Sequence, residues 1–212
     1  SRRDLSDRAY VYIWADGNKM QADHMLHKKA AYLNKDFFVV RLVIYFVFWG
    51  VLSRFLFSKS VEQDKTGAPE IRSKLQGLCA PSMILLALTL TFASIDFLMT
   101  LEPKWYSTIF GVYYFAGAVV SFHSFFALTL MWLQKNGRLA KSVTSEHYHD
   151  IGKMMFAFTA FWAYIAFSQF MLIWYANIPE ETEWYHLRAH GPWGMVSFAM
   201  IAVNFVIPFF GL

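Results

Sequence analysis

The sequence holds a single cysteine, Cys79, among 212 residues. A disulfide within the chain, a four-cysteine zinc site and a cysteine-ligated iron–sulfur cluster are therefore excluded. It also lacks a C-x-x-C-H string, the attachment motif of c-type haem. Charge is scarce as well, since Asp, Glu, Lys and Arg make up 16% of the residues, whereas about a quarter is usual in soluble domains. We expect the chain itself to bind no metal and no redox cofactor.

Charged residues are missing from long apolar stretches. Residues 109–133, 154–176 and 193–212 contain no Lys, Arg, Asp or Glu, and 79–101 contains only Asp96. Roughly 20 apolar residues cross a bilayer as a helix, and these stretches show no strict apolar/polar alternation typical of a barrel strand. The sequence predicts an all-α membrane protein that is part of a larger polytopic helical bundle. About five transmembrane helices are expected, at 37–57, 79–101, 109–133, 153–176 and 193–212.

The remaining segments are polar. Residues 1–36 are predicted to be extramembrane or interfacial, with 20–33 as a short interfacial helix and Asp36 as the N-cap of the first span. The chain starts without Met and stops in an apolar run, so we expect further helices before and after it.

The basic residues predict a topology. Connections 58–77 and 134–152 carry more Lys and Arg than 102–108 and 177–192, which places the first two in the cytoplasm. The basic residues of 1–36 count against this assignment. We interpret the net charge of +4 as a topology signal and expect no nucleic-acid partner.

Asp96 is the strongest candidate for chemistry, because an ionisable group inside a bilayer usually faces a bundle interior or a proton path. It lies about 8 Å from the end of its span at ~1.5 Å per residue. Tyr113 and Tyr114, at similar depth on the next span, are the expected hydrogen-bond donors. Two interpretations stay open: a structural carboxylate held by hydroxyls, or a proton-relay acid.

His123 is the second candidate, near the middle of the third span. A bis-histidine haem is disfavoured because no second histidine lies at that depth, which leaves a hydrogen-bonded neutral imidazole or a step of a proton path. Ser94 and Gln169 are further polar candidates for such a path. The string from Glu146 to Asp150 is interpreted as a helix start capped by Thr144 or Ser145 rather than as a metal site.

Several strings resemble the NrfD-like membrane subunits of alternative complex III, a quinol:cytochrome c oxidoreductase. They are AAYLN at 30–34, FFVVR at 37–41, WYSTIFGVY at 105–113, AFTAFWAYIAFSQF at 157–170 and IWYANIPEE at 173–181. The resemblance runs from about residue 24 to the end of the chain, and the family has about ten spans.

The resemblance implies an accessory membrane subunit of a bacterial respiratory or photosynthetic complex in the inner membrane. It implies a scaffold with a proton path, a quinone contact, or both. Haem and iron–sulfur clusters would reside in partner subunits: a multihaem cytochrome, an iron–sulfur protein and a paralogous quinone-site membrane subunit, with a terminal cytochrome oxidase as a further partner. Asp96 and His123 match membrane-embedded polar positions, and 177–183 would face the extracytoplasmic subunits.

The main alternative is a secondary transporter or another multi-pass subunit without a redox role. Transporters favour helices broken by Gly or Pro at mid-membrane in repeated halves. Here Pro208 alone lies deep in an apolar run, and no repeat is visible.

Overall fold

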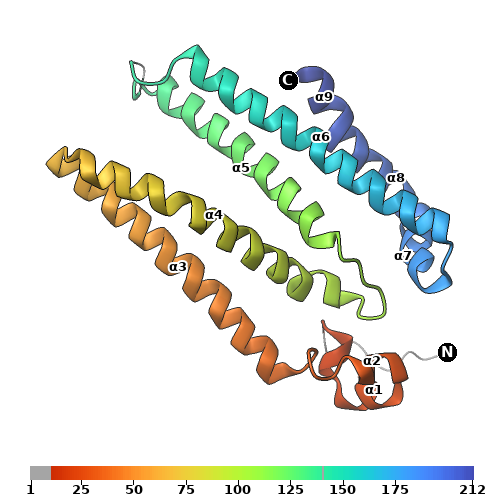
Figure 1. Ribbon diagram of the computed structural model, residues 1–212. Coiled ribbons are helices and arrows are strands. Elements are labelled where there is room, and N and C mark those ends of the chain that lie inside the picture. The colour runs from red at the N-terminus through yellow and green to blue at the C-terminus, as the bar shows by residue number, and fades with distance from the viewer. Residues whose placement is uncertain (1–10, 140) are drawn as a thin grey trace. The chain divides into compact units, whose positions relative to one another are not determined.

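A computed structural model describes residues 11–139 and 141–212 (Figure 1). All regular structure in these two ranges is helical, which confirms the all-α prediction. Five helical segments are long and apolar enough to cross a membrane: Lys35–Thr66, Pro69–Leu101, Phe110–Lys135, Ser145–Ala176 and Pro192–Gly211. The chain divides into two units, with the boundary between Tyr106 and Ser107.

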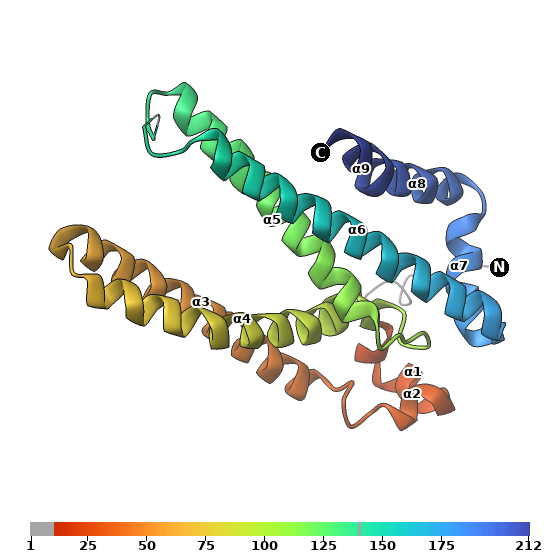
Figure 2. The same ribbon diagram turned by 45° about the horizontal axis from the view of Figure 1, so that its top comes forward.

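The first unit is built on a helical hairpin of α3 (Lys35–Thr66) and α4 (Pro69–Phe97), which lie side by side (Figures 1 and 2). The Asn34 side chain accepts a hydrogen bond from the Phe37 amide at 2.9 Å and caps α3. The predicted cap, Asp36, lies instead in the first turn, where its charge suits the helix dipole.

The hairpin is longer than the sequence predicted. The 32 residues of α3 span about 48 Å, whereas the hydrocarbon core is about 30 Å thick. The polar segment 58–77, expected to be a loop, is helical except at a short turn around Gly67. Gly67 has φ 66°, a left-handed conformation that glycine adopts without steric cost and that ends α3. The two helices therefore extend beyond the hydrocarbon.

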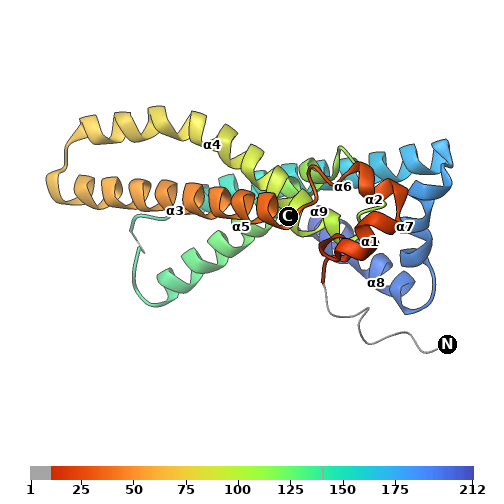
Figure 3. The same ribbon diagram turned by 90° about the horizontal axis from the view of Figure 1, so that it is seen from below.

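A small cap precedes the hairpin and is seen from below in Figure 3. It contains η2 (Ile13–Ala15), α1 (Gly17–Ala22) and α2 (His24–Lys28). The prediction of a single interfacial helix over 20–33 is thus wrong, because Asp23 ends α1 and is the N-cap of α2. The apolar core of this N-terminal cap is formed by four buried side chains: Trp14, Met20, Leu26 and Leu33.

The second unit contains α5 (Phe110–Lys135) and α6 (Ser145–Ala176), which pack along each other. Thr144 caps α6 in a reciprocal capping box with His147, which confirms the predicted helix start. The segment 177–192, expected to be a loop, folds largely into α7 (Pro179–Ala189), a short helix at the end of α6 (Figure 2).

The last span consists of α8 (Pro192–Ile201), a π-helical turn η4 (Ala202–Val206) and α9 (Ile207–Gly211). Pro208 has no backbone N–H and cannot donate the hydrogen bond of a regular α-helix. The wide π-helical turn that precedes it accommodates this missing hydrogen bond. The turn from α7 into α8 is tight, since a Cβ on Gly194 would lie 2.6 Å from the Ala189 carbonyl oxygen. After this turn the last span runs back towards α6, which η4 and α9 contact, and a cavity is left between them.

Candidate functional sites: a buried ion pair and an aromatic cavity

Asp96 forms a buried ion pair with Arg41. Its carboxylate is 0% exposed, and Arg41 is 8% exposed. Arg41 Nε donates to Oδ2 at 2.8 Å and Nη2 donates to Oδ1 at 3.0 Å. This is the two-pronged guanidinium–carboxylate geometry that gives strong, oriented hydrogen bonds. The pair joins the start of α3 to the end of α4.

Two tyrosines complete the shell of Asp96. The Tyr32 hydroxyl donates to Oδ1 at 2.9 Å, and the Tyr45 hydroxyl donates to Oδ2 at 2.8 Å. Burial and the nearby negative charge of Asp96 raise the pKa of Tyr32 to about 12, so its hydroxyl remains a donor at neutral pH. The Arg41 guanidinium lies 3.9 Å from the centre of the Tyr32 ring and 4.3 Å from that of Phe37.

This arrangement favours the structural interpretation of Asp96. Each carboxylate oxygen accepts two hydrogen bonds, one from Arg41 and one from a tyrosine. A charge removed from water is tolerated when it is paired and its lone pairs are satisfied, and all of these requirements are met here.

The cap is tied to the α4 end of the hairpin by further polar contacts. Lys29 Nζ donates to the Pro103 carbonyl at 2.6 Å, and Lys104 forms an ion pair with Asp23 at 2.7 Å. Burial lowers the pKa of Lys29, and the hydrogen bond from Lys104 lowers the pKa of Asp23. The Tyr12 hydroxyl donates to the Phe97 carbonyl at 3.2 Å. The ion pair thus belongs to a network that holds the cap on the helix ends.

The other candidates from the sequence lie in different surroundings. Ser94 is buried on α4 and donates to the Thr91 carbonyl at 2.7 Å. His123 Nδ1 lies 2.8 Å from the Val119 carbonyl, one turn earlier on α5. The expected donors Tyr113 and Tyr114 belong to the second unit, whereas the observed donors to Asp96 come from the first.

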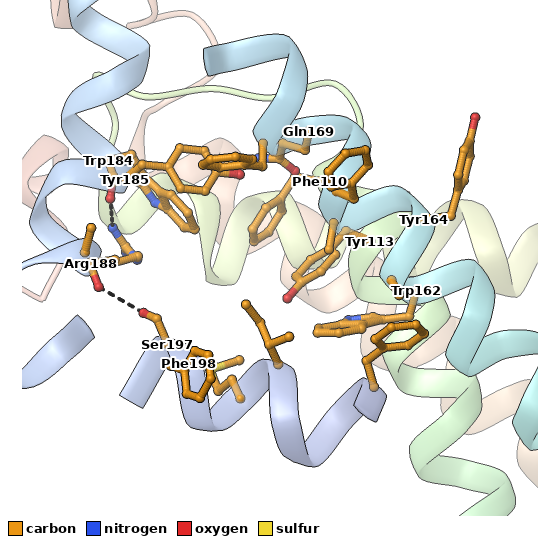
Figure 4. Close-up of a pocket in the computed structure, with 18 of the residues that line it drawn as sticks. Phe110, Tyr113, Trp162, Tyr164, Gln169, Trp184, Tyr185, Arg188, Ser197 and Phe198 are labelled. Atoms are coloured by element: carbon orange, nitrogen blue, oxygen red, sulfur yellow. Dashed lines mark hydrogen bonds between the residues drawn. The ribbon is translucent and has the colours of Figure 1, made fainter. Parts of the chain in front are cut away.

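A cavity of about 1110 Å³ lies in the second unit, between α6, α7 and α8 (Figure 4). Tyr113 and Gln169, both predicted as polar candidates, line it. Tyr113 packs on Trp162 with ring centroids 5.3 Å apart, and its hydroxyl points into the cavity, while Tyr164 points away (Figure 4). Tyr114, an immediate neighbour in sequence, is exposed and does not line the cavity.

Polar groups gather at the α7 end of the cavity. Arg188 Nη1 donates to the Trp184 carbonyl at 3.0 Å, and Ser197 Oγ donates to the Arg188 carbonyl at 3.0 Å (Figure 4). Burial, with a smaller contribution from Tyr113, raises the pKa of Tyr185 to about 12, so this hydroxyl is also protonated at neutral pH. The cavity can accept a long apolar molecule with a polar end group.

Histidines of the second unit do not meet carboxylates in a metal-like set. His186 and His190 are adjacent, with ring centroids 5.8 Å apart, and His190 Nδ1 lies 2.8 Å from the His186 carbonyl. Throughout ranges 11–139 and 141–212, no three His, Cys, Asp or Glu side chains are grouped to hold a metal ion.

Comparison with known proteins gives no matching family model and no similar curated protein. Function is therefore inferred from the residues, from the two sites and from the resemblance described above.

Proposed function

We propose that this chain is an integral membrane subunit of a bacterial quinol-oxidising complex related to alternative complex III. In this role it provides a scaffold for partner subunits and contributes a proton path, a quinone contact, or both. Electrons would pass through haem and iron–sulfur groups held by those partners, which are a multihaem cytochrome, an iron–sulfur protein and a paralogous membrane subunit.

The observation that carries the proposal is where the sequence strings that resemble the family lie in the structure. The strings at 30–34 and 37–41 supply Tyr32 and Arg41, two of the residues that bind the Asp96 carboxylate. The strings at 105–113 and 157–170 supply Tyr113, Trp162 and Gln169 of the cavity. The residues behind the resemblance thus contribute to both the ion pair and the cavity, in addition to apolar helix surface.

The helix surfaces support a role within a larger assembly. At most 22% of the most apolar 18-residue window of any span is buried within the chain. Large apolar side chains such as Phe125 and Trp132 are 70% and 63% exposed. Lipid or neighbouring membrane helices must cover such surface, because it would be unfavourable in water.

For the proton path, the second unit supplies the better candidates. The hydroxyl of Tyr113 and the amide of Gln169 face one cavity, and His123 lies about 15 Å further along α5 at ~1.5 Å per residue. Asp96, whose oxygens are all engaged, is assigned to the scaffold.

Affinity purification from native membranes tests the proposal. The tagged chain, extracted in a mild detergent, should retain a multihaem cytochrome and an iron–sulfur protein by mass spectrometry. The preparation should show a reduced-minus-oxidised haem spectrum and quinol:cytochrome c activity. A chain that purifies with no redox subunit would contradict the proposal and favour the transporter alternative.

A further inference from the structure

The cavity of the second unit is elongated along the helices. Its lining runs from Ala160 to Phe170 on α6, about 15 Å, and from Gly194 to Phe209 on the last span, about 22 Å, at ~1.5 Å per residue. Half of a ~30 Å hydrocarbon core is about 15 Å. The cavity therefore has the length of an acyl chain in one leaflet.

Its walls are suited to a flexible apolar chain. Three alanines, Ala160, Ala163 and Ala166, leave room along α6, and the rings of Phe205 and Phe209 line the end furthest from α7 along the chain. Their apolar surface favours hydrocarbon over water. Among the lining residues that the structure describes, no second charged group is present to recognise a compact polar ligand.

The opposite end carries a cation at the level of the membrane interface. Arg188 lines the cavity from the last turn of α7, the short helix that connects the ends of two spans. Its guanidinium lies 3.7 Å from the centre of the Trp184 ring and donates to the Trp184 carbonyl, which fixes its orientation. A guanidinium presents five N–H donors in a fork and can bond several acceptors at once, phosphate oxygens included.

We propose that this cavity binds one anionic phospholipid, with an acyl chain between α6 and α8–α9 and the phosphate held by Arg188. The charge complementarity between the guanidinium and the headgroup selects this occupant over a neutral quinone, which would gain no ionic contact at the mouth. The hydroxyl of Tyr185 also lines the cavity and could donate to an ester oxygen of the lipid. The inference goes beyond the proposed function, because lipid retention does not depend on electron transfer.

Native mass spectrometry of the delipidated full chain, titrated with palmitoyl-oleoyl phosphatidylglycerol or the matching phosphatidylcholine, tests the headgroup. The wild type should retain one phosphatidylglycerol about tenfold more tightly than phosphatidylcholine, equivalent to ~1.4 kcal/mol. Arg188→Gln should remove this preference, and Arg138→Gln, an exposed arginine in the α5–α6 turn, should keep it. Equal retention of the two lipids by the wild type, or an unchanged preference in Arg188→Gln, would overturn the proposal.

A phosphatidylglycerol with a diazirine at the end of one acyl chain tests the location. Irradiation should label residues around Phe205 and Phe209, and Ala163→Phe, which fills the cavity, should reduce this labelling at least fivefold. The labelling is measured on wild-type protein first, so the result stands even if Ala163→Phe fails to fold. Labelling confined to other helices, or protection by decylubiquinone but not by unlabelled phosphatidylglycerol, would refute the assignment. Failure of this test leaves the subunit composition found by purification unaffected, so the two proposals are separable.

Discussion

Replacing Asp96 by Asn should destabilise the first unit, although the two side chains have nearly the same shape. The carboxylate accepts four hydrogen bonds, two from Arg41 and one each from Tyr32 and Tyr45. Asn keeps one oxygen, but its NH₂ group would face an arginine N–H, which cannot accept, so donor would meet donor. The buried guanidinium would also lose its counter-charge. Removing one partner of a buried pair costs about 3–5 kcal/mol.

A double-mutant cycle separates the pair from its surroundings. Arg41→Met and Asp96→Leu should each cost about 3–5 kcal/mol, because each leaves one buried charge alone. The combined variant removes both charges and should recover most of that loss, so the coupling energy should approach the sum of the two single losses. The exposed pair Lys59–Glu62, at 2.7 Å, provides the control, since Glu62→Gln should cost only about 0–1 kcal/mol.

Equilibrium unfolding in mixed micelles, followed by tryptophan fluorescence, measures these free energies. The quinol:cytochrome c activity of the purified complex against pH gives a second readout. A proton relay predicts that Asp96→Asn folds like the wild type and alters turnover or its pH dependence. An Asp96→Asn variant whose free energy of unfolding equals that of the wild type would refute the structural assignment.

Topology, tyrosine ionisation and cofactor content can each be measured separately. With exposed Cys79 first replaced by Ser, cysteines placed at Gln63 and Asn136 should resist impermeant reagents in intact cells, and rapid modification would invert the topology. The tyrosinate absorbance lost in Tyr32→Phe should titrate near pH 12 and not near 10. Because the folded pKa lies above the ordinary value, the stability that Tyr32 contributes is complete below pH 10 and is lost as the pH rises towards 12. The chain purified without partners should show no haem or iron–sulfur spectrum, and a cofactor that remains bound to it alone would exclude our interpretation.

The sequence predicted the spans well because their signal is local. Apolar length and missing charges define a membrane helix without reference to its neighbours, and all five predicted spans lie within or nearly within the observed helical segments. The predicted helix ends were less accurate, because segments 58–77 and 177–192 were expected to be loops and are largely helical. Both segments are polar enough to resemble loops, yet a polar helix forms readily where its backbone continues an existing helix or packs against one.

The sequence also carries a signal for the charged partner of Asp96, which our prediction did not use. Arg41 lies seven residues after Asn34, the N-cap residue of α3, and Asp96 lies five residues before Leu101. The two opposite charges therefore fall at similar depth on the antiparallel helices α3 and α4. Comparing the second span with the first places Arg41 opposite Asp96. Our prediction compared the second span with the third, where Tyr113 and Tyr114 lie at the depth of Asp96.

The cavity could not be anticipated in the same way. It depends on α7 being a helix and on the tight turn at Gly194, after which the η4 and α9 parts of the last span contact α6. Gln169 and Tyr113 were recognised as polar residues within spans, but nothing in their spacing shows that they face one space. Such a site arises from tertiary packing, whereas periodicity reports only on single helices.

The most direct test of the proposed role is quinol:cytochrome c oxidoreductase activity in membranes of a strain that lacks only this chain. Activity contributed by other complexes can be subtracted with a strain that lacks the co-purifying redox subunits. Our account predicts that activity is lost, that the haem-containing subunits do not assemble, and that the wild-type chain restores both. Full activity and normal assembly in its absence would contradict it.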